Sequence, residues 1–316
     1  MVESMRFAVI VPVLNPGPLW QEWLHRLSLQ ACRPDILLVV DSESTDGALQ
    51  KWVLPNQQTL TVKRAEFNHG GTRQWAVEQI ADQVDVVVLL TQDALLETPH
   101  ALVRILGAFA DPAVALAYGR QLPHIDAKPL GAHARHFNYD DHSQIKSRDQ
   151  ILALGIKTCF NSNSFAAYRI SDLFELGGFP RHVILSEDTY VAAKAILAGK
   201  SVAYVAEATV EHSHDYTMAE EFRRYFDIGV FHASEPWLMQ SFGAAEGEGA
   251  RFVRSELDYL LKHAPYLIPI APFKTLAKWI GYRLGKLYNY LPRSLCCRLS
   301  MHKKYWDQAK TGVAHV

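Results

Sequence analysis

The 316-residue sequence has few cysteines and no hydrophobic run long enough to cross a bilayer. Its four cysteines form no C-x-x-C pair and no spacing typical of metal sites, so we expect buried thiols in a reducing compartment. A membrane span needs about 18 uninterrupted apolar residues, and the best candidate, APYLIPIAPF from Ala264, is short and contains prolines. The N-terminal apolar residues are too few and too β-branched for a secretion signal. These absences predict a cytoplasmic protein that does not span the membrane.

The loops that mark common nucleotide-binding enzymes are also missing. No G-K-[ST] follows Gly70-Gly71, and no G-x-G-x-x-G follows the first predicted strand, which argues against kinase-type and nicotinamide-dependent enzymes. A sugar nucleotidyltransferase would carry a G-x-G-T-R-like loop where this chain has Pro12-Val-Leu-Asn15. The sequence therefore excludes the standard forms of these classes.

Charge is nearly balanced over the whole chain but not along it. The net charge is −1, yet residues 251–316 hold 12 Lys and Arg against 3 Asp and Glu. Two interpretations of this basic, aromatic region stay open: an amphipathic helix packed on the main domain, or a surface that lies on an anionic bilayer as a peripheral anchor. Nucleic acid is not expected as a partner, because the rest of the chain is acidic and would repel phosphates.

Apolar periodicity in the first 90 residues alternates between strand and helix. We expect strands at Phe7–Val13, Ile36–Val40 and Val84–Leu90, and helices at Leu19–Gln30 and Thr72–Ala81. This order predicts an α/β fold with a parallel, doubly wound sheet and a ligand at the carboxyl ends of its strands.

The later elements follow from the same reasoning. We expect a helix at Leu95–Ala110, a long functional loop at Gly119–Lys157, strands at Ser164–Tyr168 and Ser201–Val205, and a helix after Asp188. The glycine-rich segment GAAEGEGA predicts a linker at 243–250 between a domain of residues 1–242 and a helical region of residues 251–316.

Two adjacent carboxylates, Glu187 and Asp188, stand at the predicted start of a helix. Acidic residues are favoured there as helix caps. A functional role for the two carboxylates is therefore inferred only when the other acidic loops are considered with them. Asp93 ends the third strand in Thr91-Gln92-Asp93, where a carboxylate can bind Mg²⁺ or Mn²⁺. His212 and His214, on one side of the segment VEHSHDY, are candidates to complete that metal site, and the alternative is a pair of surface histidines.

Other loops offer contacts to a nucleotide sugar. Asp41 follows the second strand and is interpreted as a ligand contact, whereas Asp46 is interpreted as a helix cap. Arg73 lies in the first turn of the helix after Gly70-Gly71, where an anion or a polar base edge is favoured. Asn163 and Ser164 in FNSNSF are candidates to hydrogen-bond the hydroxyls of a sugar. The alternative, which is equally favoured, is that they are ordinary polar residues of a turn and a strand edge.

Seven segments in order, FAVIVPVLN, VVDSESTDG, FNHGGTR, TQDA, NSNSFAAYR, ELGGF and SEDTYVAAKAILAG, resemble those of inverting family-2 glycosyltransferases with the GT-A fold. The resemblance covers about Met5 to Phe231. FNHGGTR, HSHDY and RRYFDIG are most similar to the bacterial rhamnosyltransferase branch. The family implies a GT-A fold, Rossmann-like and mostly parallel in its sheet, here with a C-terminal helical extension.

The resemblance also implies roles for individual residues. Asp188 becomes the catalytic base, with Glu187 orienting the base or the acceptor, and Asp93 becomes the metal carboxylate. The implied contacts to the nucleotide sugar are Pro12, Asn15, Asp41, Ser42, Arg73 and Gln92. Two positions depart from the family pattern: Thr91 replaces the first acid of the D-x-D element, and Glu43 stands where glycine is common.

The reaction implied is transfer of L-rhamnose from dTDP-L-rhamnose to a cell-surface polysaccharide or lipopolysaccharide acceptor, by single displacement with a divalent metal. A single catalytic carboxylate suffices, unlike in glycosidases. The alternatives are the same catalyst with a UDP- or GDP-hexose donor and a non-catalytic protein that binds nucleotide sugars.

Overall fold

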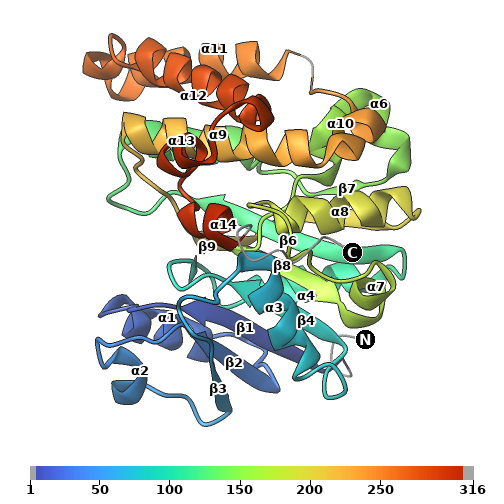
Figure 1. Ribbon diagram of the computed structural model, residues 1–316. Helices are drawn as coiled ribbons and strands as arrows, with labels where there is room; N and C mark the ends of the chain where they lie inside the picture. Colours follow the sequence, from blue (N-terminus) through green and yellow to red (C-terminus); the bar gives the residue numbers. More distant parts are fainter. Residues whose placement is uncertain (1–4, 246, 309–316) are drawn as a thin grey trace.

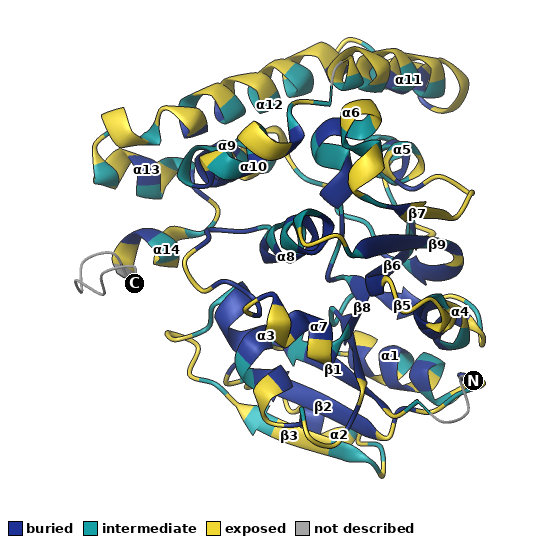
Figure 2. Cartoon of the chain, turned by 90° about the vertical axis from the view of Figure 1, so that its right-hand side faces the viewer, coloured by how far each residue is buried: buried dark blue, intermediate teal, exposed yellow. Residues whose placement is uncertain are grey.

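The computed structural model describes residues 5–245 and 247–308, which form a nine-stranded mixed sheet with helices on both faces (Figures 1 and 2). The strands are β1 (Phe7–Val13), β2 (Ile36–Asp41), β3 (Gln57–Thr61), β4 (Val86–Leu90), β5 (Leu95–Leu96), β6 (Val114–Leu122), β7 (Gln144–Lys146), β8 (Phe165–Arg169) and β9 (Ser201–Glu211). Their order is β3-β2-β1-β4-β8-β6-β9-β5, with β7 also paired to β9.

The first four strands form a parallel half of the sheet, in which β1, β2 and β4 were predicted from the sequence and β3 was not. β1 pairs in parallel with β2 and β4, and β2 pairs in parallel with β3. β8 then runs antiparallel between β4 and β6, while β6 and β9 are parallel to each other. The carboxyl ends of β1, β2 and β4 therefore lie at one edge, where an α/β sheet binds its ligand.

Helices cover the sheet in two apolar layers because strand side chains alternate between its faces. In β1, Val9 and Val11 face the layer that holds α1 and α4, whereas Ala8 and Ile10 face the layer that holds α3, α8 and α9. The helices are α1 (Leu19–Ser28), α2 (Ala48–Lys51), α3 (His69–Glu78), α4 (Ala101–Gly107), α5 (Pro129–Asn138), α6 (Ile151–Leu154), α7 (Ile170–Glu175), α8 (Glu187–Leu197), α9 (Met218–Ser234), α10 (Pro236–Phe242), α11 (Glu248–His263), α12 (Ala271–Lys286), α13 (Arg293–Leu299) and α14 (Lys303–Gln308).

Two predicted elements are wrong. The helix expected from Leu95 begins only at Ala101, because Leu95–Leu96 pairs with β9 and Pro99 disfavours helical backbone just before it. The loop expected at Gly119–Lys157 instead contains the end of β6 together with α5, β7 and α6. Helix α5 was missed because its contacts are aromatic and histidine rings, which leave little apolar periodicity: His133 and Phe137 pack on Phe252 of α11.

The basic C-terminal region packs on the rest of the chain through α12. A Cβ atom at Gly281 or Gly285 would overlap the backbone oxygen of Phe222 or Phe226, so these glycines permit α12 to lie directly against α9 (Figure 1). Cys296 and Trp306 join the same apolar cluster as Phe226. One of the two interpretations of the basic region, a packed helix, therefore holds for one face of α12.

Helix α11 begins at Glu248, inside the predicted 243–250 linker, and one linker residue, Glu246, lies outside the described residues. The division into a domain of residues 1–242 and a helical region of residues 251–316 stays a prediction. Among the described residues, no helix combines the length and apolar character that crossing a membrane requires.

Candidate active site

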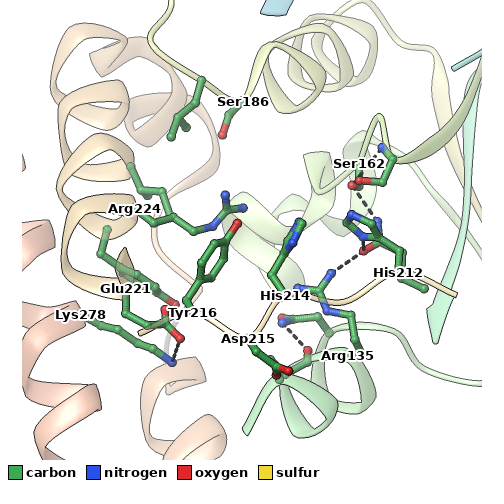
Figure 3. Close-up of a pocket in the computed structure, with 18 of the residues that line it drawn as sticks. Arg135, Ser162, Ser186, His212, His214, Asp215, Tyr216, Glu221, Arg224 and Lys278 are labelled. Carbon is green, nitrogen blue, oxygen red and sulfur yellow. Dashed lines mark hydrogen bonds and ion pairs between the residues drawn. The ribbon is translucent and has the colours of Figure 1, made fainter. Parts of the chain in front are cut away.

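A cavity of about 660 Å³ lies between the sheet and the helices α5, α9 and α12 (Figure 3). Glu187 and Asp188 at the start of α8 line it, together with His212 and His214 from the segment after β9. The structure thus brings together two candidate groups that are 24 or more residues apart in sequence. Arg73, Asn163 and Ser164 line the same cavity.

The start of α8 is strained where the carboxylates project. Ser186, which precedes the helix, has a φ of 62°, and its side chain provides no capping hydrogen bond. Non-glycine residues with positive φ are uncommon and cost about 1–3 kcal/mol when the surrounding structure holds them. The three such residues in the described chain, Asn15, Glu43 and Ser186, all lie in candidate site loops.

Asp188 is held by backbone donors. Its Oδ2 accepts from the N–H of Asn163 at 3.1 Å and its Oδ1 accepts from the N–H of Thr189 at 2.7 Å. Burial, and then the negative charge of Glu187, raise the pKa of Asp188 to about 6. A carboxylate with a pKa in this range is a stronger base than an ordinary Asp and is still ionised at neutral pH, as a general base requires.

Glu187 forms a buried ion pair with Arg73. Oε1 of Glu187 accepts from Nη1 of Arg73 at 2.8 Å and from Nδ2 of Asn163 at 3.1 Å, and both charged side chains are less than 10% exposed (6% and 8%). Burial opposes the charge of Glu187, but Arg73 and His69 outweigh it and lower the pKa. Glu187 therefore remains ionised beside Asp188, and Arg73, predicted to contact the nucleotide, is committed to this pair.

Asn163 has a positioning contact that the sequence did not indicate. A hydrogen-bonded series runs from Asn161 through the hydroxyl of Tyr168 to Asn163, each step 2.6 Å long. Asn163 then bonds both Glu187 and Asp188. Its side-chain amide donates to Glu187 and accepts from Tyr168, and its backbone N–H donates to Asp188. A contact of Asn163 with a sugar stays a prediction, as does that of Ser164.

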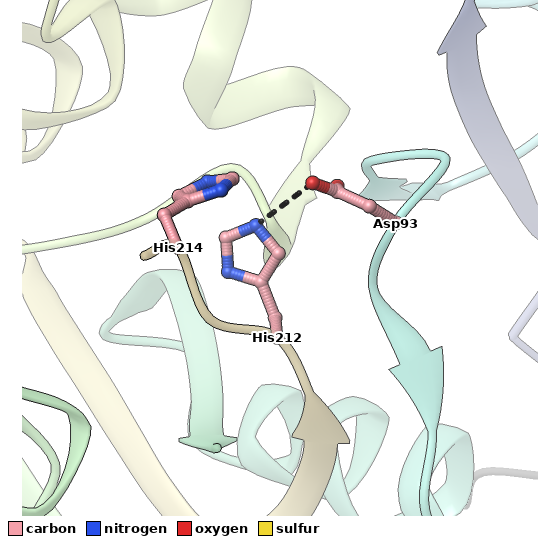
Figure 4. A group of neighbouring side chains, drawn as sticks. All are labelled: Asp93, His212 and His214. Atoms are coloured by element: carbon pink, nitrogen blue, oxygen red, sulfur yellow. Dashed lines mark ion pairs between the residues drawn. The ribbon is translucent and has the colours of Figure 1, made fainter. Parts of the chain in front are cut away.

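Asp93, His212 and His214 form a compact group whose ligand atoms all lie within 4.8 Å of one another (Figure 4). Nε2 of His212 is 3.5 Å from Oδ2 of Asp93, and the rings of His212 and His214 meet edge to face at 4.6 Å. His212 is 4% exposed, so the alternative of two surface histidines is wrong. The predicted metal ligands are adjacent in space.

The hydrogen bonds of His212 fit a metal ligand. Arg135 can only donate, and it bonds Oε1 of Gln121, which identifies that atom as an acceptor. Nδ1 of His212, 2.9 Å from the same Oε1, must then donate, which leaves a lone pair on Nε2 toward the Asp93 carboxylate. Two acceptors facing each other at 3.5 Å are stabilised by a shared cation, and a second-sphere partner on the other ring nitrogen is usual for metal-binding histidines.

The protonation state of His214 agrees with this interpretation. Burial lowers the pKa of His214 to about 4, so its imidazole is neutral near pH 7. A neutral imidazole is the form that binds a divalent ion.

Apart from Arg73, the predicted nucleotide contacts lie at a neighbouring edge of the sheet rather than in the cavity. Gln92 uses both ends of its amide on the backbone of Leu14, at 2.7 and 3.2 Å, and so joins the loops after β1 and β4. Asn15 accepts from the N–H of Thr45 at 2.8 Å and donates its own N–H to Ser44 at 2.9 Å. These contacts fix the loop after β1 against the loop after β2.

The loop after β2 explains one departure from the family pattern. Glu43 takes a φ of 62°, which is the backbone conformation that favours glycine, and its carboxylate accepts from the N–H of Arg64 at 2.8 Å. Asp41 accepts from the N–H of Ser44 at 2.9 Å, and Asp46 accepts from Ala48 at 3.1 Å near the start of α2, as a cap does. Nucleotide binding by Asp41 stays a prediction.

Ser42 and Pro12 lie at the same edge of the sheet. Ser42 is 3% exposed, and its buried hydroxyl has no hydrogen-bond partner among the described residues. Pro12 pairs in register with Val40 of β2. Both remain predicted nucleotide contacts.

Sequence reasoning missed the groups that line the rest of the cavity. Gln121 and Arg135, which orient His212, come from β6 and α5, in a region predicted as loop. Arg224 of α9 and Lys274 and Lys278 of α12 also line the cavity. No local pattern could have identified them, because their role depends on where α5, α9 and α12 pack.

No protein-family model matches the sequence. It is 51% identical over 302 residues to O-antigen chain rhamnosyltransferase WbaN of Salmonella anatum, covering 95% of this chain and 96% of that protein. It is also 51% identical over 304 residues to O-antigen chain rhamnosyltransferase RfbN of Salmonella typhimurium, covering 96% of each.

Solved structures share the fold at low sequence identity. The mannosyltransferase PcManGT from Pyrobaculum calidifontis, in complex with GDP-Man and Mn²⁺, aligns with a TM-score of 0.54 at 20% identity, over 97% of this chain and 86% of that one. Residues 1–349 of S. aureus TarS align with a TM-score of 0.52 at 16% identity, over 99% and 93% of the two chains. Glucosyl-3-phosphoglycerate synthase from Mycobacterium tuberculosis, with Mn²⁺ and UDP-glucose, gives 0.51 at 17% identity, over 76% and 80%. The predicted GT-A fold is confirmed.

Proposed function

The chain belongs to the O-antigen chain rhamnosyltransferases, and on that premise we propose that it transfers L-rhamnose from dTDP-L-rhamnose to a hydroxyl of an O-antigen acceptor with inversion at the anomeric carbon. The observation that supports this most is the placement of Asp188, a base with a pKa raised to about 6, in the cavity that His212 and His214 also line. A base and a candidate metal group on one cavity fit a single displacement at a nucleotide sugar.

In this mechanism Asp188 takes the proton from the acceptor hydroxyl. The acceptor oxygen forms a bond to the anomeric carbon as the bond from that carbon to the diphosphate oxygen breaks, and the electron pair leaves with dTDP. Glu187 keeps the pKa of Asp188 raised, and Asn163 fixes the direction of its carboxylate.

The donor-metal site is proposed at Asp93, His212 and His214. A divalent ion, Mg²⁺ or Mn²⁺, would offset charge on the leaving diphosphate when bound there. Two imidazole ligands would favour Mn²⁺ over Mg²⁺, which prefers an all-oxygen shell. We assign the thymidine end of the donor to the loops of Asn15, Asp41 and Ser42, which Gln92 connects to the strand that precedes Asp93.

A donor panel tests the proposal. The native chain is incubated with dTDP-L-rhamnose, UDP-glucose and GDP-mannose, each with Mn²⁺, with Mg²⁺ or with EDTA, and an O-antigen acceptor. We expect turnover of dTDP-L-rhamnose at least about tenfold above the others, because each lost polar contact to a buried base costs a factor of this size. EDTA should abolish it, and Mn²⁺ should restore it better than Mg²⁺. Preference for UDP or GDP sugars would overturn the donor assignment.

We infer further that the protein docks on the inner face of the cytoplasmic membrane through the hairpin of α11 and α12. Phe273 and Trp279 of α12 are about 60% exposed (62% and 60%), and an apolar groove between the two helices includes Leu257 and Leu276. The same two helices carry basic residues, whereas residues 1–250 are acidic overall: Arg251, Arg254, Lys262, Arg283 and Lys286. Exposed aromatics beside cations fit an anionic bilayer surface.

Vesicle sedimentation tests the docking surface. Native protein is expected to pellet with vesicles that contain 30% phosphatidylglycerol, at low salt, whereas a Phe273→Glu/Trp279→Glu variant should remain in the supernatant. Phe174→Glu is the control, because Phe174 is an exposed aromatic residue on α7, away from the hairpin (Figure 1). Equal pelleting of all three proteins would contradict the assignment, as would no pelleting of the native chain.

A further inference from the structure

Arg224 is a cation in the cavity that forms no ion pair among the described residues. Its side chain forms no ion pair and no hydrogen bond within residues 5–245 and 247–308, and its guanidinium carbon lies 5.7 Å from the ring centre of Tyr216. Figure 3 shows Arg224 and Tyr216 directed into the cavity, with Ser186 on one side and His214 on the other. The side chain is therefore positioned by ring contact while its charge faces the cavity.

The other cavity cations are already engaged. Arg73 pairs with Glu187, Lys278 pairs with Glu221, and Lys274 donates to the backbone oxygen of Tyr216 at 2.7 Å. Arg135 donates to Gln121. Lys128 has no side-chain partner in the described chain, but it lies beside the acid Asp215, whose carboxylate accepts from its backbone N–H.

The acids three residues before and after Arg224 on α9 are engaged with other groups. Glu221 pairs with Lys278 at 3.6 Å, and the buried Asp227 accepts from the N–H of Met301 at 2.8 Å. The positive charge of Arg224 opposes the burial that raises the pKa of Asp227, and it adds to burial in lowering the pKa of His214. Its charge thus reaches the metal group.

We propose that Arg224 binds the diphosphate of the nucleotide sugar and neutralises the charge that develops on it as the sugar leaves, an inference that rests on the proposed function. A nucleotide diphosphate sugar brings two negative charges and gains a third when its glycosidic bond breaks. A divalent cation with Asp93 supplies a net charge of only +1, so the leaving group requires another cation. Arg224 is placed beside His214 to supply it, and a guanidinium matches phosphate oxygens in a bidentate arrangement.

Preorganised charge of this kind acts mainly on the transition state. Removing one such group typically lowers kcat by about 10²–10³-fold. Substrate binding should weaken less, because the third charge is absent from the intact donor. The free product dTDP, which carries that charge, should lose affinity more than dTDP-rhamnose does.

The experiment compares native protein with Arg224→Gln, Arg224→Lys and the matched control Arg223→Gln. Arg223 is the adjacent arginine, is exposed and does not line the cavity. Binding of thymidine, dTMP and dTDP is measured by calorimetry with Mn²⁺, and kcat and KM are measured with dTDP-L-rhamnose. We expect Arg224→Gln to weaken the binding of dTDP at least about tenfold and to leave the binding of thymidine unchanged. The same variant should lower kcat about 10²-fold or more. Arg224→Lys should recover part of both, and Arg223→Gln should behave as native.

Several results would overturn the proposal. Unchanged dTDP binding in Arg224→Gln, or a loss confined to the KM for the acceptor, would place Arg224 on the acceptor instead. Equal losses in Arg223→Gln and Arg224→Gln would mean that the effect comes from the positive charge of the surface and not from a contact of Arg224. A native protein that binds UDP or GDP but not dTDP would contradict the proposed donor alone, and Arg224 would then be tested with the diphosphate that binds.

Discussion

An Asp188→Asn variant is expected to lose about 10²–10⁴-fold in kcat, the usual contribution of a general base. The variant keeps the size and polarity of the side chain, and its amide oxygen can still accept from Thr189 or Asn163. Binding of dTDP-L-rhamnose, measured by calorimetry, should therefore change little. Turnover at the native rate would place the base on another residue.

The pH dependence of the native enzyme should report the same group. Asp188 must be ionised to accept a proton, so kcat/KM should rise about tenfold per unit below pH 6 and level off above it. Asp188→Asn should lack this ascending limb.

Stability provides the control for this variant. The pKa of Asp188 is higher in the folded protein than in an unfolded chain, so its ionisation opposes folding above pH 6, by about 3 kcal/mol for a shift of two units. Removing the charge should leave the Tm at pH 7.5 equal or higher. A lower Tm would mean that lost activity reflects unfolding.

The second large effect concerns the buried ion pair. An Arg73→Leu variant leaves Glu187 charged, buried and unpaired beside Asp188, which should cost about 3–5 kcal/mol. At roughly 2–4 °C per kcal/mol the Tm should fall by about 10 °C. The double variant Arg73→Leu/Glu187→Leu removes both charges and should recover part of the loss. Thermal unfolding of the three proteins measures this.

An exposed pair provides the comparison. Arg6 and Asp85 are about half exposed, so Arg6→Leu should cost less than about 1 kcal/mol.

The effect of Arg73→Leu on stability should also depend on pH in a defined direction. The pKa of Glu187 is lowered on folding, so the stability that it contributes is present above its unfolded pKa and disappears as pH falls through its folded pKa. A double variant less stable than Arg73→Leu would contradict this account.

Local pattern was sufficient for the first half of the fold. β1 has the bounds that its apolar run predicted, and β2 is one residue longer, because buried parallel strands are short, continuous runs rich in β-branched residues. Helix α3 begins three residues earlier than predicted, since Asn68 rather than a later residue caps it by accepting from Gly71. The strand ends then place Asp41 and Asp93 at one edge of the sheet.

Local pattern failed where an element's partner lies far away in sequence. Helix α5 packs its rings on α11, more than 100 residues later, and β5 exists only because β9 lies beside it. Neither pairing leaves a periodic signal in its own segment.

The sequence by itself determined three parallel strands of the sheet, the family resemblance and the identity of Asp188, Asp93 and the two histidines as candidates, because these depend on residue type and on order along the chain. Only the tertiary structure decided that Arg73 pairs with Glu187, that Gln121 orients His212, and that Arg224 faces the cavity without an ion-pair partner among the described residues. Such roles arise from contacts between segments distant in sequence, and burial there changes the charge and the basicity of each group. No residue's own neighbours along the chain contain that information.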